Sequence, residues 1–225
     1  MKQLSSALLL LLALVASSCS KDDNTVSPPA AAVASDYWMP TTAGAKSMFE
    51  GSSVLSRPGS TVDSTAEAMT MVMLGIKKPT LDGKSAYVVH TYNATTTGTD
   101  TTESYMALSA TAITMYDSSL AAGTASTMLQ TPLTVGNSWL YQPSDTVHYR
   151  IVSTSETVVT PAGTFTNCLQ IRHSATDPTT GGTGTQDYYV ARGVGLVRVQ
   201  VLATFTFLGT TATYRTDMKL VSKTF

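Results

Sequence analysis

The chain has 225 residues, enough for one domain with a sizeable core, and its formal net charge is −1. With 14 basic against 15 acidic residues, it has neither the positive surface that nucleic acid requires nor a polybasic patch for anionic lipid. Charged residues make up 13% of the chain, about half the usual share, whereas threonine occurs 38 times. Because a β-branched hydroxyl side chain suits a strand better than a helix, this composition favours β-structure with a neutral exterior.

Residues 1–18 have the pattern of an export signal. Lys2 supplies the positive start, and residues 7–16 form an unbroken apolar run. At about 15 Å as a helix, this run is too short to cross a bilayer. Two serines then precede Cys19, which resembles a bacterial lipobox, although Ala16 stands where leucine is usual. The resemblance implies cleavage before Cys19 and its acylation, with palmitate for example. The alternative is ordinary secretion with a free Cys19.

Lys21, Asp22 and Asp23 follow this cysteine. A lysine and two acidic residues at this place resemble the export signal of Bacteroidota lipoproteins. The resemblance implies an outer-membrane protein held by its lipid anchor, on the cell surface or on the periplasmic face. The alternative is the hydrophilic start of a tether. Residues 19–35 as a whole lack periodicity and contain two prolines, so we expect a flexible tether here.

Residues 36–225 alternate between short apolar segments and clusters of turn-forming residues. In the clearest segment, 196–207, valines and phenylalanines at every second position share one face. About ten antiparallel strands predict an all-β domain with a closed or partly open β-barrel, or alternatively a β-sandwich. Only residues 120–129 could form a short helix, although Gly123 weakens this prediction. The other predicted strands cover residues 68–76, 85–93, 104–108, 112–117, 147–159, 165–173, 187–191 and 213–221.

The two halves of this domain, 36–128 and 129–225, show similar features in the same order. We interpret them as two copies of one β unit, neither of which buries its apolar face alone. The alternative is that β proteins reuse similar turns. The matched pairs are Pro40 with Pro132, Gly44 with Gly136, Phe49 with Tyr141, His90 with His173 and Tyr105 with Tyr188.

The second half resembles a known family. The stretch PLTVGNSW at 132–139 with Tyr141, TPAGTF at 160–165 and GVGLV at 193–197 are together similar to the TapB-like family of uncharacterised envelope proteins. The resemblance covers about residues 130–200. It implies a barrel-like β fold and an envelope location. It assigns no catalytic residue to this chain.

No catalytic, metal-binding or cofactor motif is recognisable in the sequence. His90, His148 and His173 form no metal-ligand pattern. Cys168 is the cysteine that remains after acylation of Cys19, and we expect it to be a packing residue. We therefore predict neither a metal nor a cofactor.

Methionines alternate along one predicted strand and recur on its neighbours. We expect them to fill the core, and the alternatives are a Cu(I) site or an adaptable lipophilic pocket. They are Met69, Met71, Met73, Met106 and Met115.

These observations predict a non-enzymatic binding or envelope-assembly module, whose ligand is a glycan, a lipid or an envelope protein. We regard Trp38, Trp139, Tyr141 and Tyr149 as the first candidates for stacking on a sugar, with core packing as the alternative. A hydrolase of envelope polymers would need carboxylates or a Ser–His pair that converge in a cleft. A purely structural envelope component is the third alternative.

Overall fold

The computed structural model describes residues 32–225, with gaps at 96–97, 143–146, 177–181 and 208–209. The predicted lipidation site Cys19 and export signal Lys21, Asp22 and Asp23 lie outside the described residues. The described residues belong to one compact unit, Ala32–Phe225. Among the described residues, no helix is both long and apolar enough to span a bilayer.

Twelve antiparallel strands of the described chain form one sheet, in the order β6-β5-β4-β3-β2-β1-β12-β11-β10-β9-β8-β7. The prediction of an all-β, antiparallel, barrel-like domain is thus confirmed. The strands are β1 (Lys46–Arg57), β2 (Ser60–Pro79), β3 (Ser85–Thr95), β4 (Gly98–Leu108), β5 (Ala112–Tyr116), β6 (Ser126–Gln130), β7 (Ser138–Leu140), β8 (His148–Thr160), β9 (Gly163–Thr176), β10 (Thr183–Ala191), β11 (Gly195–Phe207) and β12 (Thr210–Thr224). Two 3₁₀ helices accompany them, η1 (Ala34–Tyr37) and η2 (Ala122–Thr124).

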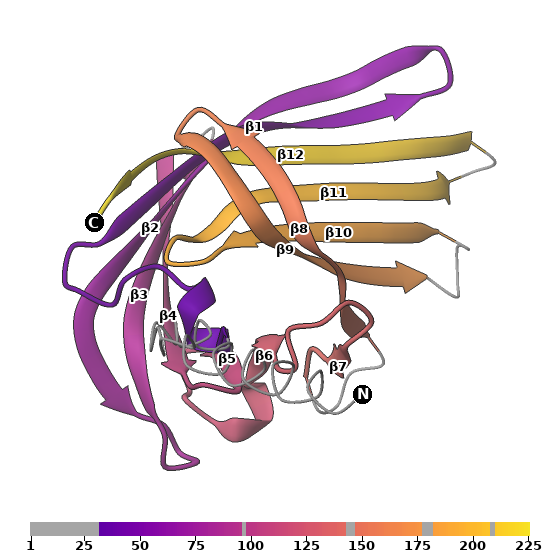
Figure 1. Cartoon of the computed structure of the whole chain (residues 1–225). Helices are drawn as coiled ribbons and strands as arrows, with labels where there is room; N and C mark the ends of the chain where they lie inside the picture. The colour runs from indigo at the N-terminus through magenta and orange to yellow at the C-terminus, as the bar shows by residue number, and fades with distance from the viewer. Residues whose placement is uncertain (1–31, 96–97, 143–146, 177–181, 208–209) are drawn as a thin grey trace, which may run out of the picture. The chain divides into compact units, whose positions relative to one another are not determined.

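The sheet curls into a nearly closed barrel, so that its two edge strands, β6 and β7, meet (Figure 1). We call this junction the seam. The backbone N–H of Thr127 in β6 donates to the carbonyl of Tyr141, 2.7 Å away. The indole Nε1–H of Trp139 donates to the Thr127 carbonyl at 2.9 Å, and Gln142 Nε2 donates to Ser126 Oγ at 3.0 Å. Because β6 and β7 are short and few backbone hydrogen bonds join them, side-chain hydrogen bonds help to close the barrel at the seam.

Residues 120–129 do not form the short helix that the sequence analysis allowed. The segment contains the single turn η2 and then enters strand β6. Leu120 has a φ of 56°, which is incompatible with a right-handed helix, and threonines in the segment favour extended backbone. The helix prediction was wrong here because the tertiary pairing of β6 with β5 overrides a weak local preference.

Alternate residues of the strands face the inside of the barrel and form the main core. Met73 lies directly opposite Val89, and both are fully buried, as is Met106. Burial of one such side chain stabilises the fold by about 1.5–3 kcal/mol. All five methionines singled out in the sequence lie in the hydrophobic core or pack against it, as expected of core residues.

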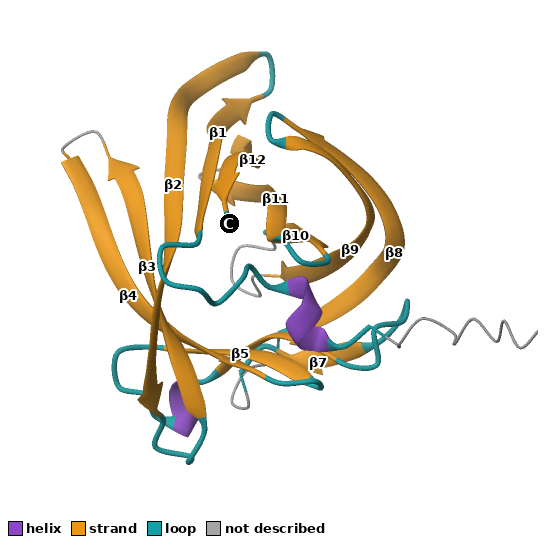
Figure 2. Ribbon diagram, turned by 60° about the vertical axis from the view of Figure 1, so that its left-hand side comes forward, coloured by secondary structure: helices purple, strands orange, loops and turns teal. Residues whose placement is uncertain are grey.

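Helix η1 lies inside the curve of the sheet and fills one end of the barrel (Figure 2). The Ala34 N–H donates to the Ala110 carbonyl at 2.9 Å, and the Gly193 N–H donates to the Asp36 carbonyl. Arg192 also pairs with Asp36, with 2.7 Å between Nη2 and Oδ2. Loops from both halves of the sheet therefore hold η1 in place.

The β8–β9 hairpin bends over the sheet (Figures 1 and 2). Three register shifts between β8 and β9 mark bulges, which allow a hairpin to curve sharply. Near the hairpin turn, the Ala162 N–H donates to the Leu220 carbonyl of β12 at 3.2 Å. The bend creates a second core cluster, which contains Phe49, Val158, Cys168, Ala191, Val197 and Leu220.

Strands β1 and β12 pair along their length and join the two halves of the meander. At Gly51 of β1, an added Cβ would lie 2.0 Å from the backbone oxygen of Asp217. Only glycine therefore allows the two backbones to approach this closely.

We expect Gly51→Ala to destabilise the domain by about 2–3 kcal/mol, because the new methyl group must push β12 away. Urea unfolding followed by circular dichroism measures this loss. Gly123→Ala is the matched control, since a Cβ at Gly123 meets no atom within 4 Å. Equal stability of the two variants would show that the close approach at Gly51 is not a constraint.

Candidate ligand-binding groove

Aromatic rings form a column inside the barrel beside the seam. The ring centroids of Trp139 and Tyr149 are 6.2 Å apart, and those of Tyr149 and His173 are 5.2 Å apart, with nearly parallel planes in both pairs. The three residues are direct cross-strand neighbours on β7, β8 and β9, which explains the stacking. Tyr141 and Tyr188 flank Tyr149 at 5.1 and 5.9 Å.

The four aromatic residues predicted to contact a ligand differ in exposure. Trp139 and Tyr149 are only 6% and 4% exposed, and they belong to the main core. Tyr141 is half-buried and lines a groove. Trp38, which follows η1, packs against the same core and lines a separate pocket beside Arg192. Their role in ligand binding stays a prediction.

The groove beside Tyr141 has a volume of about 530 Å³. We call it the seam groove, because β6 and the residues after β7 supply one of its walls. Strands β4 and β5 and the loop after β5 supply the other. Its lining residues are Thr102, Glu103, Ser104, Met115, Tyr116, Asp117, Ser118, Gly123, Thr124, Ser126, Tyr141 and Gln142.

Two carboxylates line the seam groove, and both are held in the charged form. Hydrogen bonds from Tyr105, His90 and Lys78 lower the pKa of Glu103 to about 2. The hydroxyl groups of Ser119 and Thr124 lower the pKa of Asp117. No lysine or arginine is among the described residues that line the groove. The groove is therefore lined by many hydroxyl groups, two tyrosines and two carboxylates, of which Glu103 pairs with Lys78 at 3.2 Å.

The sequence analysis did not identify Glu103 and Asp117. They belong to no motif, and they reach one groove only because β4 pairs with β5 and the loop after β5 turns toward the seam. Tyr141 was identified because aromatic residues are large amphipathic contacts. Strand pairing is the information that would have linked it to the carboxylates.

The three histidines and Cys168 are not among the described residues that line the seam groove. His90 bonds Glu103 on the outer face of β3, with 3.0 Å between Nε2 and Oε2. His173 lies in the aromatic column, and His148 starts β8. Cys168 is fully buried, and burial raises the pKa of its thiol to about 11, so it is a poor nucleophile near neutral pH. Within the described residues, no group of three or more potential metal ligands comes together.

Comparisons with known proteins identify a fold. No family model matches the chain, and no curated protein matches its sequence. The structure is similar to a Bacteroides fragilis protein that is named as an exported protein with a YmcC-like fold. The TM-score is 0.50 at 16% identity, over 84% of this chain and 99% of that chain. A protein of Parabacteroides distasonis named as a lipoprotein matches with a TM-score of 0.46 at 14% identity, over 85% and 99% of the two chains.

At such low identity, the first of these likenesses shows the fold alone: a YmcC-like curled antiparallel sheet. The resemblance of the second half to the TapB-like family, which is centred on residues 130–200, has no matching family model and stays a prediction.

The charged state of Glu103 makes stability depend on pH. Its pKa is about 2 in the folded protein against 4.5 in the unfolded chain, so its stabilising effect is complete above pH 4.5 and disappears as the pH falls to 2. We expect Glu103→Gln to lower the free energy of unfolding at pH 7, and the difference from the wild type to shrink across this range. Urea unfolding at a series of pH values measures it.

Glu50→Gln, on an exposed position of β1, is the control. The same pH dependence in both variants would contradict a special role for the Glu103 hydrogen bonds.

Proposed function

We propose that this protein is an envelope lipoprotein whose barrel domain binds an uncharged glycan in the seam groove. The observation that carries the proposal is the position of Tyr141. Its ring is half-buried, leans on the aromatic column and lines a groove with carboxylates, hydroxyl groups and an amide.

This combination suits a sugar. A tyrosine offers an apolar ring face with a polar edge, on which the C–H face of a pyranose can stack. Ionised carboxylates accept strong hydrogen bonds from sugar hydroxyl groups, and the serine and threonine hydroxyls can donate or accept. Asp117 would repel an anionic sugar, which favours an uncharged one, whereas the charge of Glu103 is paired with that of Lys78.

The charge state of the carboxylates favours binding over hydrolysis. A glycoside hydrolase needs one carboxyl group with a raised pKa, so that it is protonated when it acts as the general acid. The pKa values of both Glu103 and Asp117 are lowered instead. A purely structural component, in turn, has no need of an open groove of about 530 Å³ lined mainly by polar groups.

The envelope location rests on the N-terminal residues. An apolar run, small residues and Cys19 are followed directly by Lys21, Asp22 and Asp23. The name of the Bacteroides fragilis protein of similar fold, an exported protein, supports the same location. We propose that lipid on Cys19 anchors the domain in the outer membrane, facing the cell surface.

The glycan proposal is tested by screening the protein on an array of uncharged oligosaccharides, followed by calorimetry with the best ligand. We expect saturable binding that Tyr141→Ala weakens about tenfold and Tyr141→Phe preserves, since the ring supplies the contact. Leu140→Ala is the control, because Leu140 is the exposed neighbour in β7. A wild-type protein that binds no uncharged glycan, or a Tyr141→Ala variant that binds normally, refutes the proposal.

The anchor is tested by Cys19→Ser. We expect the wild-type protein to sediment with membranes and the variant to move to the soluble fraction, since the acyl chains supply the membrane affinity. Immunoblots of the fractions measure the distribution. A variant that stays in the membrane would place the anchor elsewhere in the chain.

A further inference from the structure

A second pocket lies where strands β2 to β5 approach one end of the sheet. It has a volume of about 720 Å³, and its charged lining residues are Lys77 and Lys84. No carboxylate is among the described residues that line it, in contrast to the seam groove. We call it the lysine pocket. Its hydroxyl groups come from Thr41, Ser85, Tyr87, Ser109, Thr111 and Thr114.

Lys77 differs from the neighbouring lysines in its ion pairing. Lys78 pairs with Glu103 at 3.2 Å, and Lys84 pairs with Asp82 at 2.8 Å. Within the part of the chain that the structure describes, no carboxylate oxygen lies within 4.0 Å of the Lys77 ammonium. Its positive charge is thus available to a ligand.

The backbone of β2 brings Lys77 to the pocket. The register of β2 against β3 shifts between Met73 and Lys77, with Gly75 at a φ of 71°. A Cβ at Gly75 would lie 2.8 Å from atoms of Ala43, so the segment before β1 crosses the bulge closely. Beyond the bulge, Lys77 lies directly opposite Tyr87, with Thr41 among the neighbouring lining residues.

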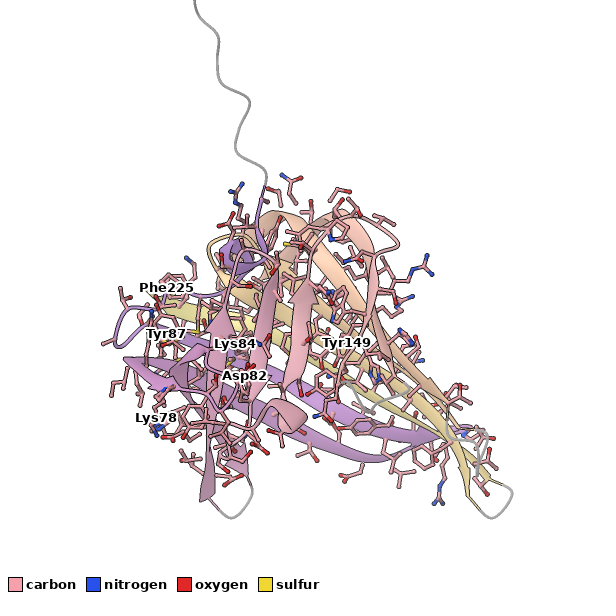
Figure 3. The ribbon with its side chains drawn as sticks, turned by 90° about the horizontal axis from the view of Figure 1, so that it is seen from below. Lys78, Asp82, Lys84, Tyr87, Tyr149 and Phe225 are labelled. Atoms are coloured by element: carbon pink, nitrogen blue, oxygen red, sulfur yellow. The ribbon has the colours of Figure 1, made fainter. Side chains whose placement is uncertain are left out.

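Lys77 and Tyr87 form a unit within the pocket. The Lys77 ammonium lies 4.5 Å from the centroid of the Tyr87 ring. Hydrogen bonds with Thr41 and Lys77 lower the pKa of the Tyr87 hydroxyl. Figure 3 labels Tyr87 of β3 together with Lys84 and Asp82 of the turn that precedes β3. A cation, an aromatic ring and several hydroxyl groups therefore converge on one open space.

We propose that the lysine pocket binds a sugar that carries a carboxylate or phosphate group. The Lys77 ammonium pairs with the anion, and the threonine and serine hydroxyls bond the hydroxyl groups of the sugar. Lys84 contributes less, because its ammonium pairs with Asp82 at 2.8 Å and donates to the Tyr116 hydroxyl at 3.2 Å. This binding is separate from that of the uncharged glycan, and it does not depend on the seam groove.

The test uses saturation-transfer NMR with the full chain in detergent and four probes: glucuronate, glucose 6-phosphate, glucose and inorganic phosphate. We expect both acidic sugars to bind at least about fivefold more tightly than glucose, and more tightly than phosphate, at low salt. We expect Lys77→Gln to weaken the binding of both acidic sugars about fivefold, and Lys77→Arg to bind them like the wild type. Added salt weakens binding because the pocket is open to solvent.

Lys223→Gln is the matched control, since the Lys223 ammonium also lies over a ring, 4.7 Å from the centroid of Phe225, but lines none of the pockets described above. This variant should bind like the wild type. Equal affinities of the Tyr141→Ala variant, whose seam groove is disabled, for glucose and glucuronate would overturn the proposal, as would normal binding of the acidic sugars by Lys77→Gln. Phosphate binding as tight as that of glucose 6-phosphate would overturn the sugar part. Tyr141→Ala should leave the acidic sugars unaffected, so the two proposals fail separately.

Discussion

The pairing of β1 with β12 is the constraint on which the barrel depends. All other strand pairs connect neighbours in the chain, so each half of the meander is a local structure with an open edge. Only β1 and β12 bring the first and last strands of the domain together, and they allow the outer edges, β6 and β7, to meet at the seam. Gly51 permits the pairing of β1 with β12. On the opposite side of the barrel, the Trp139 indole stabilises the seam by its hydrogen bond to Thr127.

The period-two pattern predicted the fold class because alternate side chains of a strand face opposite sides of a sheet, as in β8, where Tyr149 and Ile151 are buried and the residue between them is exposed. It missed β1 because this strand turns Ser47 and Ser53 inward, where both are nearly fully buried. Ser53 is satisfied by the hydroxyls of Thr216 and Tyr214, each 2.9 Å away. A strand that buries hydroxyl groups looks polar in the sequence, and only its partner on β12 explains why the burial is tolerated. Strand β7 was missed for another reason, since three residues are too few to show a period.

The proposed repeat stays a prediction, and the structure adds two observations to it. Two of the matched pairs lie on strands of equal rank in each half: His90 and His173 on β3 and β9, and Tyr105 and Tyr188 on β4 and β10. The matched prolines and glycines lie outside the strands. Their environments differ, however. His90 bonds Glu103 on the outer face, whereas His173 stacks on Tyr149 inside the barrel. Strand order in the two halves is thus similar, while the side chains that form the aromatic column belong to the second half.

Charge separates the two candidate sites along β4 and β5. The seam groove uses residues 102–104 and 115–118, and the lysine pocket uses residues 107–109, 111, 112 and 114. Glu103 bonds outward to Lys78, so this lysine is neutralised, while Lys77 next to it turns toward the pocket. These consecutive lysines lie on opposite faces of β2, so that one is ion-paired and the other lines the pocket. Under the two proposals, an anionic sugar binds in the lysine pocket and an uncharged glycan in the seam groove, so the same strand pair would discriminate ligands by charge.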